Sequence, residues 1–123
     1  MLTREDILIG LRSCTAKQFS YAVDRFVSHV EICDHLAVGE LRHGGDEKSL
    51  CVRVKGDLDR AQQMITFVHE VFHIALLIHG YGDPEDEKGY EESEAMIDEA
   101  AGLFFNREPE LVGYLFRQLR RLN

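Results

Sequence analysis

Apolar residues recur every three or four positions along much of the chain, a spacing that places them on one face of a helix. The first such stretch predicts a helix from Arg4 to Ser13 with Thr3 as its N-cap. Thr15 and Gln18 then match a capping box, which predicts a second helix ending near Cys33. Its apolar positions are Ala16, Phe19, Val23, Phe26 and Val30. A strand through Phe19, Tyr21 and Val23 is the competing interpretation, but its alternation fails at Phe26.

The spacing changes to a strict alternation further along the chain. Leu50, Val52 and Val54 alternate with polar or small residues, which predicts a half-buried strand from Leu50 to Lys55. Val38 to Leu41 is the expected partner strand, and His43 to Asp46 has the composition of a turn. The region therefore predicts an antiparallel hairpin, with His43 interpreted as a solvated turn residue and not as a metal ligand.

Helical spacing returns in the apolar centre of the chain. Ala61, Ile65, Val68, Phe72 and Ala75 predict a helix with Asp57 as its N-cap and Gly80 at its end. A loop from Tyr81 to Gly89 follows, and a further helix is expected from about Glu91. Pro109 suits the first turn of a last helix, whose buried positions are predicted to be Leu111, Leu115, Leu119 and Leu122. Together these elements predict a single α+β domain over residues 1–123, mostly helical, with a small antiparallel hairpin on the central helix.

Composition and charge narrow the possible functions. The 123 residues carry a formal net charge of -8, which argues against a nucleic-acid surface. Nine carboxylates lie between Asp83 and Glu99 with one lysine, which is typical of a solvated surface. The longest apolar run, Ile74 to Ile78, is too short for a membrane span, and the N-terminus does not resemble a signal peptide, so we expect a cytoplasmic protein. The three cysteines have no metal-binding spacing and are expected to be free thiols.

The central helix contains the one chemical motif that stands out, an intact His-Glu-x-x-His formed by His69, Glu70 and His73. Residues four apart lie on the same face of a helix, so both imidazoles can point at one ion while Glu70 lies beside them. Two incidental helix histidines are the competing interpretation. The metal site is favoured because the motif falls within the best-defined helix of the chain, and it predicts bound Zn²⁺.

A catalytic zinc needs a third protein ligand and an open fourth position. Glu94 is the preferred ligand, with Asp98 one turn later as the residue that orients a ligating histidine. Glu99 is an alternative ligand, and Glu91 and Glu92 are further ones. His79 is another alternative because it follows His69 by ten residues, but in an unbroken helix it would point away from the ion.

These residues resemble the small zincin-like metallopeptidases of the ImmA/IrrE type, which are common in prophages and mobile elements. The resemblance covers about residues 37 to 115 and includes the hairpin, the His69 to His73 motif, the acidic loop and Glu108-Pro109-Glu110-Leu111. The family often has glycine or leucine within the motif and Glu-Ala-Asn on the second helix. This chain has Val71-Phe72 and, at best, Glu99-Ala100-Ala101, which leaves the third ligand open between Glu94 and Glu99.

The resemblance implies a gluzincin-like fold and, in some members, cleavage of a repressor or another regulatory protein. The motif predicts a zinc metallopeptidase in which Glu70 is the general base and the partner is a peptide or protein substrate. Leu50 to Lys55 is the expected edge strand for that substrate, and Tyr81, Tyr90 and Arg107 are candidates to stabilise the oxyanion. The alternative is a non-catalytic metal-binding regulatory module of phage or mobile-element origin, and hydrolysis of a non-peptide amide is a third option.

Overall fold

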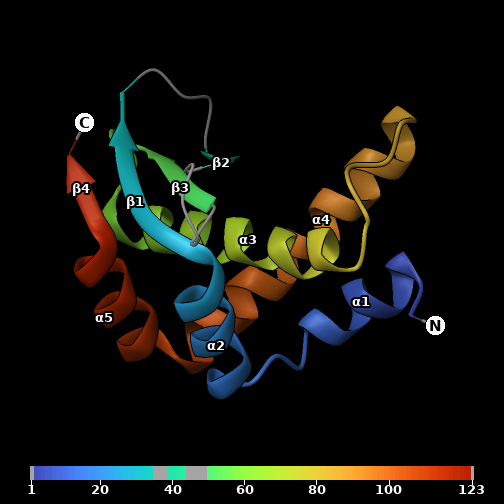
Figure 1. The fold of residues 1–123 in the computed structure, drawn as a ribbon, viewed down its shortest axis with the longest axis horizontal. Helices are drawn as coiled ribbons and strands as arrows, with labels where there is room; N and C mark the ends of the chain where they lie inside the picture. The colour runs from blue at the N-terminus through green and yellow to red at the C-terminus, as the bar shows by residue number, and fades with distance from the viewer. Residues whose placement is uncertain (1, 35–38, 44–49, 123) are drawn as a thin grey trace.

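The computed structural model describes residues 2–34, 39–43 and 50–122, which form an α+β fold of helices and a small mixed sheet (Figure 1). The sheet and the N-terminal helix lie at opposite ends of the molecule, and α3 runs between them (Figure 1). The elements in chain order are α1 (Arg4–Leu11), α2 (Ala16–Phe26), β1 (Val27–Cys33), β2 (Gly39–His43), β3 (Leu50–Lys55), α3 (Arg60–Ile78), α4 (Glu87–Arg107), α5 (Pro109–Leu119) and β4 (Arg120–Leu122).

The first two helices begin where the sequence predicts, because local hydrogen bonds define their starts. Thr15 Oγ1 accepts a hydrogen bond from the Gln18 amide at 3.1 Å, and the Gln18 side chain accepts one from the Thr15 amide at 3.0 Å. This reciprocal pair confirms the predicted capping box, and Thr3 forms a second box with Asp6. The α1 helix ends at Leu11, slightly before the predicted Ser13.

The second helix is shorter than predicted, and the correction changes the sheet. The α2 helix ends at Phe26, and Val27–Cys33 form strand β1 instead of continuing as helix to Cys33. The competing strand over Phe19 to Val23 is also wrong, since those residues lie inside α2. Val27 and Val30 are fully buried in β1, where their branched side chains fit the pleated surface. Pairing with strands distant in sequence therefore overrides the local helical spacing.

The sheet has the strand order β2-β3-β1-β4. The predicted antiparallel hairpin is confirmed by the pairing of β2 with β3, although residues 44–49 of its turn lie outside the described residues. β1 pairs with β3 and with β4, in both cases parallel. The last helix was predicted to include Leu122, but it ends at Leu119 and β4 follows. Because β3 lies between β2 and β1, it is an inner strand and not the edge strand that the sequence predicted.

The α3 helix is the centre of the core. Its N-cap is Asp59 and not the predicted Asp57, because Asp59 Oδ1 accepts the Gln62 amide hydrogen bond at 2.8 Å. It ends where Gly80 adopts a φ of 85°, a left-handed conformation that favours glycine. Within the described residues, α3 is the one helix long and apolar enough to cross a membrane, yet 56% of its apolar window is buried inside the protein. That burial is what a core helix requires.

Helix α4 packs along α3 and sets the position of the acidic residues. It begins at Glu87, before the predicted start, because Asp86 caps it by accepting the Gly89 amide hydrogen bond at 2.8 Å. Phe104 of α4 meets Phe19 with ring centroids 4.6 Å apart and meets Phe72 of α3 at 6.0 Å. These buried aromatic contacts hold α4 against α3 at a defined register.

Candidate metal centre

His69 and His73 lie one helical turn apart on α3 and turn their rings toward each other. Their Nε2 atoms are 3.2 Å apart, and their ring centroids are 5.0 Å apart. Val68 and Phe72, the residues before them, are buried in the core, so the two histidines lie at the border between the core and the surface. Burial lowers the pKa of His73, although the nearby Glu94 opposes that shift.

Glu94 of α4 reaches across to both histidines. One of its carboxylate oxygens lies 2.7 Å from His69 Nε2, and the other lies 3.0 Å from His73 Nε2. Donor atoms bound to one tetrahedral zinc are separated by about 3.3 Å, given zinc bonds of about 2.0–2.1 Å. The three side chains therefore offer the donor types that zinc prefers at slightly shorter separations, and all three line one cleft.

Asp98 contacts the far side of the His69 ring. Its Oδ1 lies 2.6 Å from His69 Nδ1, a buried nitrogen that makes no hydrogen bond of regular geometry. A carboxylate at this position holds the proton on Nδ1 and keeps the lone pair of Nε2 for a metal ion. The spacing of Glu94 and Asp98 on one helix brings both carboxylates to the His69 ring.

Glu70 lies beside the three potential ligands, and its carboxylate is farther from the His69 nitrogen than that of Glu94. Its Oε2 is 3.9 Å from His69 Nε2, and the residue is only 8% exposed. Burial raises the pKa of the Glu70 carboxyl to about 7, with His69 opposing the shift and Glu94 and Asp83 adding to it. A cation bound nearby would lower this pKa, because it would favour the charged carboxylate.

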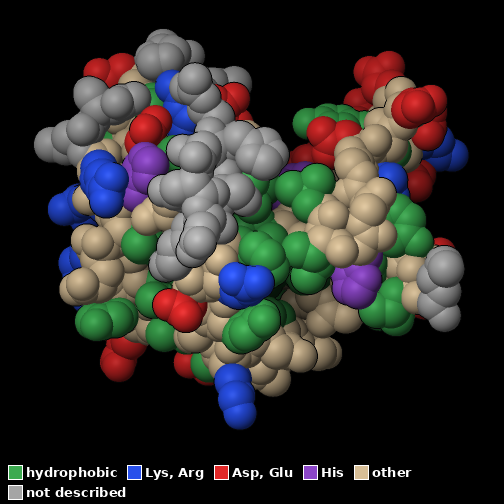
Figure 2. All heavy atoms as spheres, viewed as in Figure 1, with side chains coloured by type: hydrophobic (Ala, Val, Ile, Leu, Met, Phe, Trp, Pro, Cys, Tyr) green, Lys and Arg blue, Asp and Glu red, His purple; other side chains and the backbone are tan. Residues whose placement is uncertain are grey.

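These residues line a cleft of about 1040 Å³ between β2, α3 and α4. The surface is hollowed between the projecting start of α4, which carries many acidic side chains, and the part of the molecule that contains the sheet (Figure 2). Gly39 brings β2 close to α3, since a Cβ atom there would lie 2.5 Å from Thr66 Cγ2 and 3.5 Å from Glu70 Oε2. The cleft therefore has a strand along one wall and the motif helix as its base.

The structure places the alternative ligands away from this cluster. Glu99 forms an ion pair with Arg12 at 3.0 Å, and both side chains are more than half exposed. His79 is the exposed C-cap residue of α3. Glu91 and Glu92 are exposed on α4 and belong to none of the potential metal-binding groups among the described residues. The side chain of His43 lies outside the described residues.

Two of the three candidates for stabilising an oxyanion make hydrogen bonds outside the cleft. The Tyr81 hydroxyl donates a hydrogen bond to the Leu2 carbonyl at 2.9 Å. Arg107 donates to the carbonyls of Arg12 and Cys14, at the connection between α1 and α2. Both side chains therefore hold the N-terminal region in place. Tyr90 lines the cleft, where the negative charge of Glu94 raises the pKa of its phenol.

Asp83 is a further carboxylate near the histidines that the sequence pattern does not single out. It offers a carboxylate oxygen within 4.8 Å of the ligand atoms of His73 and Glu94, from the loop before α4. The signal available in the sequence was the acidic run that begins at Asp83, but nothing in that run distinguishes this carboxylate from its neighbours. Its proximity depends on the path of the loop over the end of α3.

Comparisons of the chain with protein-family models, with curated proteins and with solved structures find no match. The cleft and its side chains are therefore the basis for assigning a function.

Proposed function

We propose that this protein is a zinc-dependent metallopeptidase with a zincin-like arrangement of its site. The observation that supports the proposal is the convergence of His69, His73 and Glu94 from two helices, with Glu70 beside them in an open cleft. A purely structural zinc site has four protein ligands and needs no neighbouring base. Here a buried carboxylate lies next to a cluster of three donors that leaves one side accessible, which is the arrangement of a hydrolytic site.

His69, His73 and Glu94 would hold the ion, and Asp98 would keep the His69 ring in its orientation. When bound, Zn²⁺ acidifies a water molecule and polarises the carbonyl of the scissile bond. Glu70 would be the general base, which would accept a proton from the attacking water on a carboxylate oxygen and return it to the leaving amine. Tyr90, at the rim of the cleft, is the remaining candidate to stabilise the negative oxygen that develops on the substrate.

Strand β2 is the best position for an extended substrate. Among the described strands it is at the end of the sheet, and Gly39, Glu40 and Leu41 line the cleft. A peptide that pairs with β2 would run along the wall of the cleft beside Glu70. This corrects the strand chosen from the sequence, because β3 has its hydrogen-bonding edges covered by β2 and β1.

The resemblance to the ImmA/IrrE family suggests the substrate class within this proposal. A repressor or another regulatory protein is the kind of substrate that the resemblance implies. An exposed segment of such a protein could adopt the extended conformation that strand pairing requires.

The decisive experiment compares Glu70→Gln with Glu99→Gln, a neutralised carboxylate outside the cleft. Zinc content is measured by elemental analysis, and turnover is measured with a mixture of quenched fluorescent peptides. We expect Glu70→Gln to keep zinc and lose hydrolysis, and Glu99→Gln to keep both. Turnover by Glu70→Gln at the wild-type rate would refute the role of Glu70. Zinc binding without hydrolysis in the wild type would favour the non-catalytic metal-binding module.

A further inference from the structure

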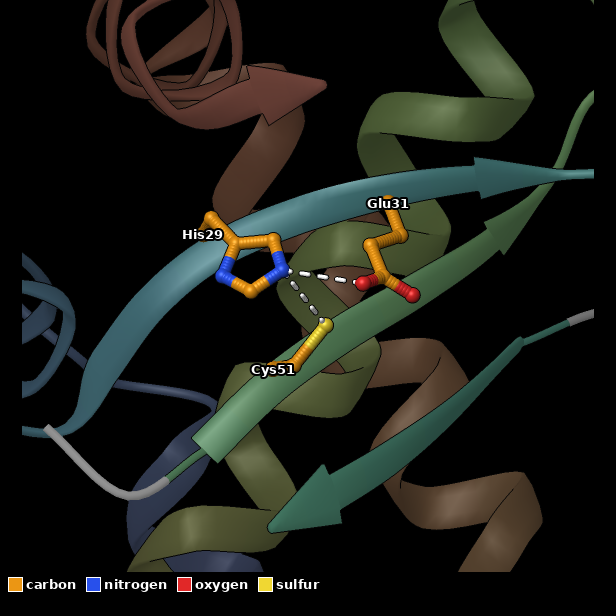
Figure 3. A group of neighbouring side chains, drawn as sticks. All are labelled: His29, Glu31 and Cys51. Carbon is orange, nitrogen blue, oxygen red and sulfur yellow. Dashed lines mark hydrogen bonds and ion pairs between the residues drawn. The ribbon is translucent and has the colours of Figure 1, made fainter. Parts of the chain in front are cut away.

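A second group of metal-binding side chains lies on the face of the sheet opposite the helices. His29 and Glu31 project from β1, and Cys51 projects from the adjacent strand β3 (Figure 3). The parallel register pairs His29 with Cys51, and the alternate residues Val30 and Val52 face the core. The three side chains meet because alternation in both strands directs them to the same face.

The contacts of this group converge on one nitrogen atom. His29 Nε2 lies 3.0 Å from Glu31 Oε2 and 3.4 Å from Cys51 Sγ, and the two dashed lines meet at that atom (Figure 3). Cys51 is 3% exposed, and the side chains of His29 and Glu31 are 19% and 24% exposed. The group is thus largely shielded from water but remains open to a small ion.

Ser28 holds the other side of the His29 ring. Its hydroxyl donates to the Leu50 carbonyl at 3.2 Å, and the same oxygen lies 2.9 Å from His29 Nδ1. A hydrogen bond to one ring nitrogen fixes the orientation of the ring, as it does for histidines that bind metal ions. Nε2, the other ring nitrogen, faces Glu31 Oε2 and Cys51 Sγ.

The geometry and charge fit a metal ion. Around one tetrahedral zinc, nitrogen and sulfur donors are about 3.6 Å apart and nitrogen and oxygen donors about 3.3 Å apart. The corresponding distances here are 3.4 Å and 3.0 Å. A Cys51 thiolate and the Glu31 carboxylate would neutralise a divalent cation. The neighbouring Arg53 contacts Glu31 Oε1 at 3.4 Å, and its own charge is paired with Glu40.

We propose that His29, Glu31 and Cys51 form a second metal site, selective for thiophilic divalent cations such as Zn²⁺, that links β1 to β3. Ser28 orients the imidazole and Arg53 orients the carboxylate, as supporting residues do in metal sites. The bound ion would connect residues 22 positions apart in the chain, on the side of the sheet away from α3. The site is independent of the proposed peptidase activity.

The test uses Co²⁺ as a spectroscopic probe on the full chain after removal of metal with a chelator. A thiolate bound to Co²⁺ gives an intense charge-transfer band in the near ultraviolet. His69, His73 and Glu94 include no sulfur, so this band reports only on the second site. We expect Co²⁺ bound at this site to produce the band and an excess of Zn²⁺ to abolish it. Absence of the band at saturating Co²⁺ would overturn the proposal.

Cysteine variants locate the site. Cys51→Ser should lose the band, and Cys14→Ser and Cys33→Ser should keep it. His29→Asn leaves the thiol in place but removes a ligand. Loss of a residue that only supports a ligand weakens metal binding by about 10–100-fold, so the dissociation constant for Co²⁺ should rise by more than this in His29→Asn. The double variant His69→Ala/His73→Ala should retain the band, which separates this site from the first. A band that survives in Cys51→Ser, or that depends on Cys33, would refute the assignment.

Discussion

Replacement of Glu94 is the sharpest test of the metal centre, because this residue joins the two helices that form it. Glu94→Ala removes the contacts at 2.7 Å to His69 and 3.0 Å to His73 and leaves two histidines on one helix. Loss of a residue that only supports a ligand reduces metal affinity by about 10–100-fold. Loss of a ligand itself should therefore reduce zinc affinity by more than about 100-fold, equivalent to more than about 2.7 kcal/mol.

The assay is competition for Zn²⁺ with a chromophoric chelator, and Glu99→Ala is the matched control. Glu99 is on the same helix, but its exposed pair with Arg12 contributes at most about 1 kcal/mol to stability. Asp98→Asn should fall between the two, with a loss of about 10–100-fold, because Asp98 contacts the ring and not the ion. To prevent zinc at the second proposed site from masking the effect, all variants are measured in a Cys51→Ser background.

Two results would refute this reasoning. If Glu94→Ala and the wild type bind zinc equally well, Glu94 is not a ligand. If Glu99→Ala loses zinc as strongly as Glu94→Ala, the effect arises from disturbance of α4 and not from the loss of a donor. Circular dichroism of each variant establishes whether the helices remain intact.

Three further predictions concern the stability of the fold. Gly39→Ala would bring a Cβ atom 2.5 Å from Thr66 Cγ2, so we expect lower peptidase activity and a loss of about 1–3 kcal/mol in urea unfolding. Adding Thr66→Ala to Gly39→Ala should recover part of the activity and part of the stability. If the effects of the two substitutions on stability are simply additive, the close approach of Gly39 to Thr66 is contradicted. Phe104→Ala should cost about 3–5 kcal/mol, because the ring is fully buried among Phe19 and Phe72, and a smaller loss in denaturant titration would argue against this packing. Burial raises the pKa of the Cys14 thiol from 9.0 to about 11, so the unfolded chain loses its proton first and stability should fall as pH rises between these values. The difference in thermal stability between wild type and Cys14→Ser should be constant below pH 9 and change above it, and a difference that stays constant throughout would exclude this linkage.

Local features of the chain were readable from the sequence because their hydrogen bonds and geometry span only a few residues. The capping box at Thr15 depends on a side chain three positions away, and Gly80 ends α3 by adopting a conformation that other residues disfavour. The pairing of His69 with His73 follows from the rise and rotation of any helix. The β2–β3 hairpin was predicted for the same reason, since its strands are close in sequence.

Strands β1 and β4 could not be predicted in this way. Residues from Val27 to Cys33 suit either a helix or a strand, because Val30 matches both spacings. The structure pairs this segment with β3 and with β4, and β4 lies near the other end of the chain. Local propensity contains no information about such partners, so the predicted helix extended too far and β4 was missed.

The sequence by itself determined that His69 and His73 share one face of a helix with Glu70 beside them, because helical geometry depends only on neighbouring residues. The tertiary structure decided which distant carboxylate joins them. Glu94 and Glu99 differ by about 140° around the α4 axis, so only one can face α3 once the buried side of the helix is set. Packing of Ile97, Ala101 and Phe104 selects Glu94, and it turns Glu99 toward Arg12. This choice depends on contacts between helices, which no local pattern specifies.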